Sequence, residues 1–441
     1  MNLIAWSGDR LIGTLDFSEA LGQFSFRYDV EWSNSPTAYT LSPFLPFRSF
    51  AGDTAELHSA RVRRFFGNLL PEGRALEDAA DAAGVGKSNL FGLLLAIGRE
   101  SSGALALLPE GSSPKHLESS RRAIPMYELS ERIRGRQDSP FSVWDKRVRL
   151  SIPGLQDKLP VQRDTDGTFS LVDGALASTQ ILKPESVSSQ VPFQVANEHY
   201  CLSLAIQVGV AAATATIIRV PEAVLVVERF DRTREKDGSV RRRHIIDACQ
   251  ALDLAVDAKY ERNFGDGRDV AHIRNGVSLP RLFSLAKLTT GAAKARLDLL
   301  RWTLFQFLIG NSDAHGKNVS FFVGHGGLEL APAYDLVSVD MYPAINHQLA
   351  MAIGDEFTLE KVRAYDWGEF AHGCGLRRLI LARQMRDLAK KVSRVAPVIA
   401  QATCYLDTER KFLVDLVGKI SERALRLQAH ADLLMKQSPS E

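Results

Sequence analysis

Residues suited to metal and phosphate chemistry gather directly after a long apolar run. The segment Gly310 to Phe322, GNSDAHGKNVSFF, follows LDLLRWTLFQFLIG and contains Asp313, Lys317 and Asn318, and Asp335 comes further along. Mg²⁺ prefers oxygen ligands, commonly one or two carboxylates together with phosphate oxygens. Asn318 and Asp335 are therefore candidate ligands of Mg²⁺. Lys317 is a candidate contact of a γ-phosphate, and Asp313 is suited to accept or orient the proton of an attacking hydroxyl.

The neighbouring sequence predicts how these residues are placed. LDLLRWTLFQFLIG is apolar on nearly every face, which predicts a buried helix over 297–310. VSFFVGHGGLELAPAYD then predicts a strand, a tight Gly turn and a strand, ending at Asp335. In protein kinases the catalytic Asp and a metal-binding Asn are likewise five apart, and a metal-binding Asp follows. The simpler interpretation is a helix cap followed by a turn, in which His315 orders the loop through a hydrogen bond.

Further nucleotide-binding candidates lie upstream. TQILKPE predicts a short strand that carries Lys183, suited to pair with ATP phosphates, and NEHYCLSLA predicts a helix with Glu198, suited to hold that lysine by an ion pair. SIPGLQDKLPV predicts a turn over the phosphates, although it matches neither of the common glycine-rich phosphate motifs. VVERFDR is similar to a kinase hinge, where the backbone at Glu228 and Phe230 would meet adenine. Solvated surface positions are the alternative interpretation of Lys183 and Glu198, and the turn and the hinge-like stretch are weak motifs when taken alone.

Length and pattern predict several parts. The chain has 441 residues, enough for two or three domains. Residues 1–122 mix short strands and helices, 123–232 are strand-rich, and 233–441 are mainly helical. In the first part LIAWSGDRLIGTLDF predicts a hairpin that turns at Gly8-Asp9, and AELHSARVRRFFGNLLPEG predicts an amphipathic helix stopped by Pro71 and Gly73. The polar stretch over 110–122 predicts a linker. We predict an α+β fold of two lobes, a strand-rich N-lobe and a helical C-lobe, with an added α/β N-terminal subdomain. Its apolar stretches FFGNLL and FGLLLAIG predict that this subdomain packs on the strand-rich lobe.

Composition excludes several classes of protein. The net charge of +2 gives no global basic field that would indicate nucleic acid. No apolar run reaches the length of a membrane-spanning helix, and the first residues do not follow the pattern of a signal peptide. The four cysteines are widely spaced, which disfavours a metal cluster or a disulfide scaffold. We expect a cytoplasmic protein with reduced cysteines and no membrane partner.

Taken together, these segments resemble the HipA family of bacterial serine/threonine kinases, the toxins of type II toxin–antitoxin pairs. TLSPFLPFR, RRFFGNLLPEGRAL and LLLAIGRESSGALALLP resemble its N-terminal subdomain. SIPGLQDKLPV, ILKPE, NEHYCLSLA and VERFDR follow in the family's order, and then HIIDACQAL, LIGNSDAHGKNVSF, LAPAYDLVSV and LAMAIGDEF. The sequence departs from the pattern at Pro153 and Leu155 of the turn, and in the loose match of IIDACQ.

The resemblance implies roles and partners. Asp313 would be catalytic with Lys317 beside it, Asn318 and Asp335 would bind Mg²⁺, and Ser151 would be autophosphorylated, which ejects the phosphate-binding turn. The implied ATP-binding residues are Gly154, Gln156, Lys158, Lys183, Glu228, Phe230 and His315. The implied protein substrate belongs to the translation machinery, an aminoacyl-tRNA synthetase. The implied partner is a HipB-like helix-turn-helix antitoxin, through which operator DNA would be contacted indirectly.

Two rival functions remain open. The first is a catalytically weak co-repressor that works by binding a DNA-bound antitoxin, and the second is a kinase of small molecules. Retention of Lys183, Asp313, Asn318 and Asp335 favours an active kinase, and the N-terminal subdomain favours a protein partner. The basic runs RVRR and RRRH are either DNA-phosphate contacts within a repressor complex or ordinary solvated faces.

Overall fold

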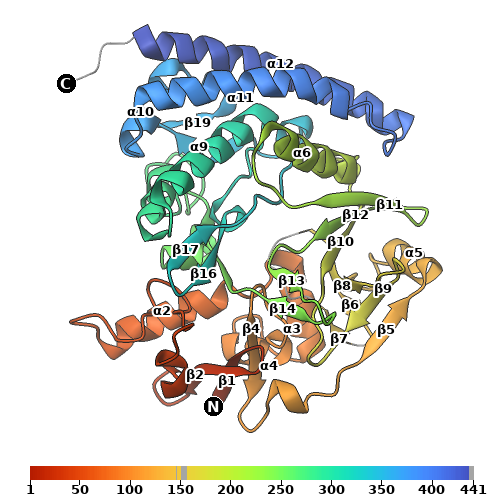
Figure 1. Ribbon diagram of the computed structural model, residues 1–441, viewed down its shortest axis with the longest axis vertical. Coiled ribbons are helices and arrows are strands. Elements are labelled where there is room, and N and C mark those ends of the chain that lie inside the picture. The colour runs from red at the N-terminus through yellow and green to blue at the C-terminus, as the bar shows by residue number, and fades with distance from the viewer. Residues whose placement is uncertain (146, 150–155, 437–441) are drawn as a thin grey trace. The chain divides into compact units, whose positions relative to one another are not determined.

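The computed structural model describes residues 1–145, 147–149 and 156–436 (Figure 1). The chain forms two compact units that share it in alternating segments. The first unit comprises Met1–Pro184, Ile218–Val256 and Phe321–Glu329, and the second comprises Glu185–Ile217, Asp257–Ser320 and Leu330–Glu441. The first unit holds most of the strands and the second most of the long helices, as an α+β protein requires.

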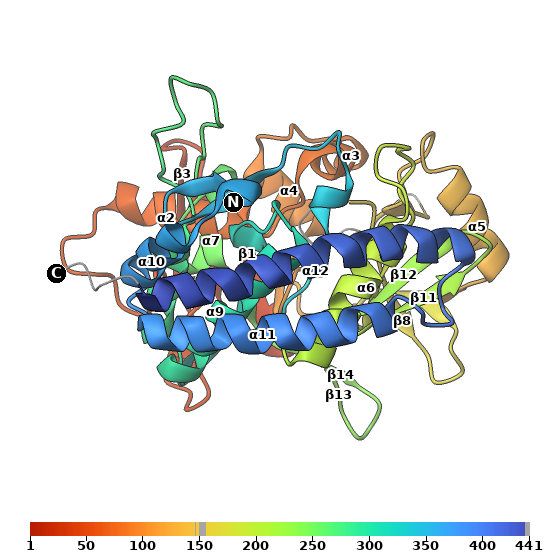
Figure 2. The same ribbon diagram turned by 90° about the horizontal axis from the view of Figure 1, so that it is seen from above.

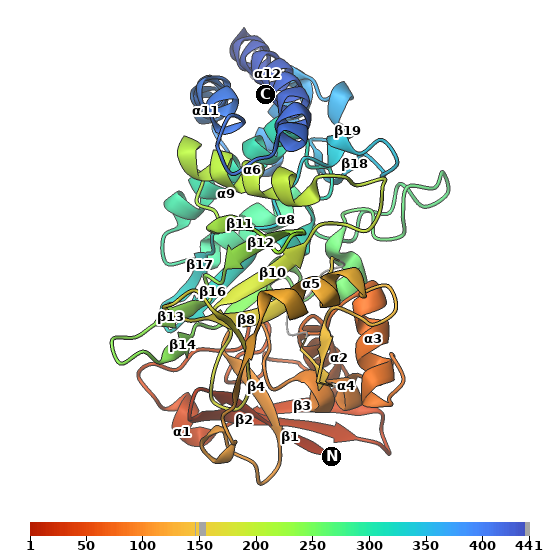
Figure 3. The same cartoon turned by 90° about the vertical axis from the view of Figure 1, so that its right-hand side faces the viewer.

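The N-terminal part of the first unit is an antiparallel sheet in the order β3-β2-β1-β4. Its strands are β1 (Asn2–Ser7), β2 (Arg10–Ser18), β3 (Gln23–Tyr28) and β4 (Leu105–Pro109), and its helices are α1 (Val30–Ser33), α2 (Ala55–Gly67), α3 (Gly73–Ala83) and α4 (Leu90–Ile97). The predicted hairpin is confirmed, because β1 pairs with β2 across a turn in which Gly8 has φ 57°. Figure 3 shows α2 and α4 beside this sheet, and both helices contact its strands.

One predicted boundary in this part is wrong. The sequence predicts a helix that continues to Pro71 and Gly73, but α2 ends at Gly67 and Gly73 opens α3. The reason is the buried Asn68, whose side-chain amide donates to the carbonyls of Arg64 and Leu254, both at 2.9 Å. A side chain that binds the last carbonyls competes with a further helical turn.

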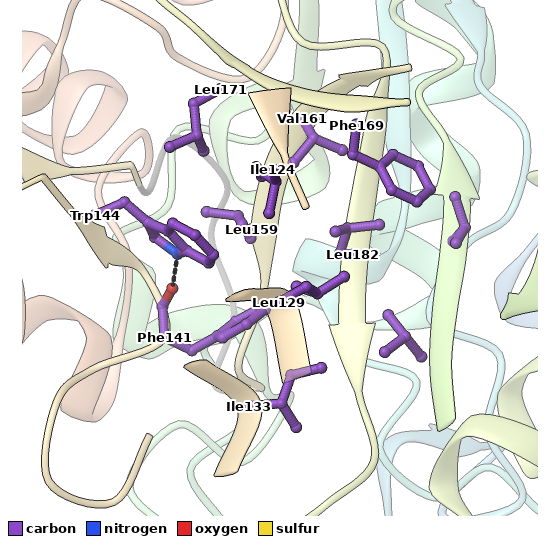
Figure 4. Close-up of a cluster of buried hydrophobic side chains, with 12 residues drawn as sticks. Ile124, Leu129, Ile133, Phe141, Trp144, Leu159, Val161, Phe169, Leu171 and Leu182 are labelled. Atoms are coloured by element: carbon purple, nitrogen blue, oxygen red, sulfur yellow. Dashed lines mark hydrogen bonds between the residues drawn. The ribbon is translucent and has the colours of Figure 1, made fainter. Parts of the chain in front are cut away.

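A six-stranded sheet in the order β11-β12-β10-β8-β9-β5 forms the rest of the strand-rich part. Its bounds are β5 (Arg121–Ile124), β8 (Leu159–Arg163), β9 (Phe169–Val172), β10 (Gln180–Pro184), β11 (Ala215–Arg219) and β12 (Ala223–Glu228), with the pair β6 (Val143–Trp144) and β7 (Arg147–Val148) nearby in the chain. Figure 4 shows the core that Leu129 and Ile133 of helix α5 (Met126–Arg134) form with this sheet and with Trp144. Trp144 donates its indole N–H to the carbonyl of Phe141 at 2.7 Å.

The predicted linker over 110–122 is only partly a linker. It contains a 3-10 turn, η1 (Pro114–His116), and its last two residues begin β5, the edge strand of the six-stranded sheet. Arg121 is held there by Asp164 at 2.7 Å and Gln162 at 3.0 Å. The polar residues of this stretch therefore belong partly to a connection and partly to a solvated edge strand.

Buried charges tie the N-terminal part to the strand-rich part, which confirms the predicted packing. Asp231 accepts hydrogen bonds from Arg229 at 3.0 and 2.8 Å, from Arg232 at 2.7 Å and from the backbone N–H of Gly103 at 2.8 Å. Arg232 also donates to the Gly103 carbonyl. The remaining short elements that lie mainly in the first unit are β13 (Arg232–Arg234), β14 (Val240–Arg242), β15 (Ile245–Asp247), α7 (Ala248–Ala251), β16 (Ser320–Gly324) and β17 (Gly327–Leu330).

The second unit is built on long helices. They are α6 (Gln194–Val208), α8 (Leu279–Ser284), α9 (Ala292–Ile309), α10 (Ala364–Gly373), α11 (Arg378–Ile399) and α12 (Asp407–Lys436), with the strands β18 (Gln348–Ile353) and β19 (Glu356–Thr358). Its short 3-10 turns are η2 (Val256–Lys259), η3 (Leu285–Leu288), η4 (Gly316–Asn318), η5 (Val339–Met341) and η6 (Leu359–Lys361). Figure 2 shows α11 and α12 side by side along most of their length. Within the described residues, none of the helices has the length and apolar character needed to cross a membrane.

Candidate active site

The predicted buried helix is α9, and its end sets the direction of the polar loop. Gly310 ends the helix in the left-handed conformation, φ 69°, and donates its N–H to the carbonyls of Gln306 and Phe307. A Cβ at this position would lie 2.9 Å from atoms of both Arg423 and Asp340. Glycine therefore meets two requirements here, an unusual φ and a close approach.

A long C-terminal helix also supports this helix end. Arg423 of α12 donates to the carbonyl of Leu308 at 2.9 Å and to the Asp340 carboxylate at 2.7 Å. Asp340 in turn donates its backbone N–H to the Gly310 carbonyl at 3.1 Å. A guanidinium at a helix C-terminus satisfies carbonyls that the helix leaves unpaired and complements its dipole. The loop that follows α9 therefore starts from a fixed point.

Asn311 links the segments that carry the two candidate aspartates. Its side-chain oxygen accepts the backbone N–H of Asp313 at 3.2 Å, and its amide donates to Gln306 at 2.9 Å and to the backbone carbonyl of Asp335 at 3.5 Å. Within the loop, the amide of Asn318 donates to the carbonyl of Asp313 at 3.0 Å. Asp313, Asn318 and Asp335 are thus brought together in one hydrogen-bonded unit.

The Asp313 side chain has a partner that the sequence did not indicate. The hydroxyl of Tyr260, the residue directly after η2, donates to Asp313 Oδ1 at 2.7 Å. Fifty-three positions separate the two residues, and no motif marks the stretch DAKYERN. Only tertiary structure reveals this contact.

His315 is a buried residue of this loop. Burial and the nearby Lys259 lower the pKa of its imidazole to about 3, which Asp335 opposes only in part. The ring meets the Tyr260 ring edge-on, with centroids 5.2 Å apart, and its Nδ1 has no hydrogen-bond partner among the described residues. The lowered pKa favours the neutral form of the His315 ring near pH 7.

Lys317 and Asn318 lie on η4, a short buried turn. The Tyr334 hydroxyl donates to the Lys317 carbonyl and lies 2.7 Å from the Ser320 hydroxyl. A Cβ at Gly316 would approach Val277 within 2.5 Å. The loop is therefore packed tightly against Val277 and Tyr334.

Asp335 is placed by its backbone. It adopts φ 56°, uncommon for a residue with a side chain. Two residues earlier, Ala333 forms two backbone hydrogen bonds of 2.8 Å with the segment after α6. Asn197 of α6 accepts the N–H of Ser338 at 2.9 Å and donates to its carbonyl at 3.1 Å. Strained backbone that surrounding contacts enforce is common at functional sites.

The donor set fits Mg²⁺ when it is bound together with a nucleotide. Asp335 could supply carboxylate oxygens, and Asn318 could supply an amide oxygen, because the nitrogen of that amide donates to the Asp313 carbonyl. Among the described residues there is no group of three or more His, Cys, Asp or Glu that could hold a metal ion. Mg²⁺ does not require one, because it commonly uses one or two carboxylates and completes its octahedron with phosphate oxygens and water.

The remaining candidates are divided between the units. Lys183 is buried on β10, opposite Leu225 of β12, and Lys158 is buried just before β8. Glu228 ends β12, and the Phe230 ring meets Phe322 at 5.9 Å.

Two predicted site residues and one predicted ion pair cannot be placed in the same way. Gln156 is the first described residue after the gap, and Ser151 and Gly154 lie outside the described residues. Glu198 is buried on α6 of the second unit while Lys183 belongs to the first, so their ion pair stays a prediction.

Known proteins are similar to this chain along nearly its whole length. The HipA N-terminal domain matches residues 3–108, and the HipA-like C-terminal domain matches residues 150–398. The serine/threonine-protein kinase toxin HipA of Shewanella oneidensis is 39% identical over 96% of this chain and 95% of its own. A putative kinase of Sinorhizobium fredii, Y4mE, is 31% identical over 92% of this chain and 94% of its own.

A solved structure gives the same result for the fold. It contains Shewanella oneidensis HipA with HipB and operator DNA, and its similarity covers 99% of this chain and 100% of that one, with a TM-score of 0.88 and 37% identity. The expected α+β class with an added N-terminal subdomain is thereby confirmed. From the extent of these matches we conclude that the chain belongs to the HipA family of serine/threonine-protein kinases.

Proposed function

We propose that this protein is an ATP- and Mg²⁺-dependent serine/threonine protein kinase that acts as the toxin of a toxin–antitoxin pair. The observation that carries the proposal is the hydrogen-bonded unit in which Asn311 connects the backbones of Asp313 and Asp335, and Asn318 binds back to Asp313. A kinase needs these groups held rigidly, because phosphoryl transfer depends on positioning and on charge stabilisation rather than on covalent chemistry of the protein.

Each residue has a part in the proposed transfer. The oxygen of a serine or threonine hydroxyl forms a bond to the γ-phosphorus of ATP, the bond from that phosphorus to the β,γ-bridging oxygen breaks, and ADP leaves. Asp313 orients the attacking hydroxyl and takes its proton. Asn318 and Asp335 would hold Mg²⁺, which neutralises charge that develops on the phosphates. Lys317 contributes positive charge at the γ-phosphate.

The other assignments complete the nucleotide site. Lys183, supported by Glu198, and the turn with Gly154, Gln156 and Lys158 bind the phosphates, while the backbone at Glu228 and Phe230 meets adenine. His315 belongs to the wall of the site as a neutral ring, in keeping with its lowered pKa. We further propose that Ser151 is autophosphorylated and that the modified turn leaves the nucleotide, which inactivates the kinase.

The proposed partners follow from the family. A relative solved with HipB and operator DNA supports a HipB-like antitoxin and indirect DNA contact for this chain as well. The proposed substrate is a protein of the translation machinery, of the aminoacyl-tRNA synthetase class, and the proposed location is the cytoplasm. The alternative is a co-repressor with weak catalysis. The presence of both aspartates and Asn318 favours the active kinase.

Mass spectrometry after incubation with Mg·ATP tests the proposal. We expect a gain of one phosphate that maps to Ser151, and no gain in Ser151→Ala. Asp313→Ala and Asp335→Ala should each lower the transfer rate by about 10² or more. ATP binding should survive Asp313→Ala better, since Asp335→Ala deletes a metal ligand. Near-normal transfer by Asp313→Ala would refute the mechanism.

Two further variants sharpen the result. Asp432→Ala removes a carboxylate from an exposed ion pair with Arg386 on the same unit and should leave the rate unchanged. His315→Ala should cost less than either active-site aspartate variant, because a neutral histidine supplies packing rather than charge. Equal nucleotide affinity of unmodified and phosphorylated protein would exclude self-inactivation through Ser151.

A further inference from the structure

Tyr260 directs a hydroxyl at the carboxylate to which the proposed function assigns catalysis. The distance from its hydroxyl oxygen to Asp313 Oδ1 is 2.7 Å, typical of a strong O–H···O hydrogen bond to a charged acceptor. Both residues belong to the second unit. Tyr260 has no role in the assignments made so far, which come from the family resemblance, from the spacing of the loop residues and from the choice of metal ligands.

The tyrosine is held from several sides. Its ring packs edge-on against His315, and the Lys259 ammonium lies 5.3 Å from its centroid. The next residue, Glu261, donates its backbone N–H to the Ala350 carbonyl at 2.9 Å and accepts the Ala352 N–H on its carboxylate at 2.8 Å. Tyr260 is therefore anchored to β18 rather than carried on a loose loop.

The same strand anchors the loop that carries Asp313. Ala350 donates its backbone N–H to the carbonyl of Ser312 at 2.8 Å. Strand β18 thus holds Ser312 through its backbone and Tyr260 through Glu261, so that donor and acceptor share one support. The backbone of Asp313 fixes the position of its Cβ but not the rotation of its carboxylate. A hydrogen bond supported in this way restrains that rotation.

We propose that Tyr260 is a positioning residue for phosphoryl transfer, which keeps the Asp313 carboxylate in the orientation that receives the substrate hydroxyl. The inference rests on the proposed function. Tyr260 acts through Asp313, so it changes the rate of transfer rather than the binding of ATP. Orientation errors of about an ångström at a reacting group cost up to about 10² in rate, and the loss of one orienting bond to a carboxylate that keeps its place in the loop should cost about tenfold.

Tyr260→Phe is the direct test, because it removes the hydroxyl and keeps the ring that packs on His315. The readout is self-phosphorylation in Mg·ATP, followed by mass spectrometry, with the rate at saturating ATP measured separately from the ATP concentration that gives half the maximal rate. We expect the saturated rate to fall about tenfold and the half-saturating ATP concentration to stay within about twofold.

Tyr405→Phe is the matched control. Tyr405 also makes a 2.7 Å hydroxyl hydrogen bond in the second unit, to His199, and that pair lies outside the catalytic loop. If loss of a buried hydroxyl lowered activity by general destabilisation, both variants would lose rate together. Thermal unfolding of each variant shows whether the two losses of stability are comparable. We expect only Tyr260→Phe to lose rate.

A double-mutant cycle with Asp313→Ala decides whether Tyr260 acts through that carboxylate. In the Asp313→Ala background, Tyr260→Phe should have no further effect on the residual rate. A further tenfold loss in the Asp313→Ala background would overturn the inference, and so would an unchanged rate in the single variant Tyr260→Phe. In either case, phosphate transfer by the wild-type protein would leave the proposed function intact. Absence of phosphate incorporation in the wild-type protein would instead overturn the proposed function, and this inference with it.

Discussion

His244 makes the stability of the first unit depend on pH in a calculable way. Its side chain is 3% exposed, its ring stacks on Tyr39 with centroids 5.1 Å apart, and its Nε2 lies 2.9 Å from the Leu41 carbonyl. A carbonyl only accepts, so Nε2 carries the proton in the neutral ring. A second proton would enter at Nδ1, which is buried without a hydrogen-bond partner among the described residues. Burial lowers the pKa of His244 from 6.5 to about 4.

The lowered pKa of His244 determines whether acid stabilises or destabilises the fold. Because the folded protein binds the proton less readily than the unfolded chain, the contribution of His244 to stability is complete above pH 6.5 and declines as the pH falls towards about 4. One pKa unit corresponds to about 1.4 kcal/mol, so a shift from 6.5 to about 4 amounts to roughly 3 kcal/mol. In a protein of marginal stability this loss is large.

Amide hydrogen exchange measured by mass spectrometry from pH 7.5 to pH 4 would detect it. After correction for intrinsic exchange rates, peptides that cover residues 38–45 should lose up to about two orders of magnitude of protection in the wild type, as roughly 3 kcal/mol requires. His244→Gln, which keeps a donor for Leu41, should show a flatter profile. His116→Gln alters an exposed histidine and serves as control. Parallel profiles for wild type and His244→Gln would refute the argument.

Three further predictions concern positions where the structure tolerates little change. Gly310→Ala should lower the unfolding free energy by about 1–2 kcal/mol in calorimetry, because alanine at φ 69° is strained and its Cβ would press on Arg423. Asn311→Ala should lower the saturated phosphorylation rate at least tenfold, because the Asp313 backbone loses its support; an unchanged rate would contradict this. Asp231→Asn should destabilise by about 3–5 kcal/mol in denaturant unfolding, because two buried guanidiniums lose a charged acceptor; an unchanged midpoint would exclude it.

The sequence predicted those parts of the molecule that local patterns determine. The all-round apolar run over 297–310 corresponds to α9, the hairpin after it to β16 and β17, and Lys183 lies on a strand as expected. Each of these depends on side-chain periodicity or on turn residues within about fifteen positions, which are properties that a sequence states directly. The helix that carries Glu198 was predicted in the same way.

The parts that the sequence did not predict depend on distant partners. Strand β5 exists because β9 is available to pair with it, and α2 ends early because Asn68 reaches the carbonyl of Leu254. Neither partner is within the local window from which the element was predicted. Strand β15 was missed for a similar reason, since its three residues join a sheet with β16, which follows more than seventy positions later.

The candidate site shows the same limit at the level of single residues. The candidate aspartates and lysines can be found in the sequence because their types and spacing are chemically informative. The residues that support them are ordinary polar residues within helices and loops. Asn197, Asn311 and Arg423 each satisfy backbone groups of the segments that carry Asp313 and Asp335 or of the helix end before them. A backbone N–H pairs with any suitable acceptor and a backbone carbonyl with any suitable donor, so the partner can be supplied by many residue types from many places in the chain. Such support has no fixed spacing, and that is why the structure was needed to find it.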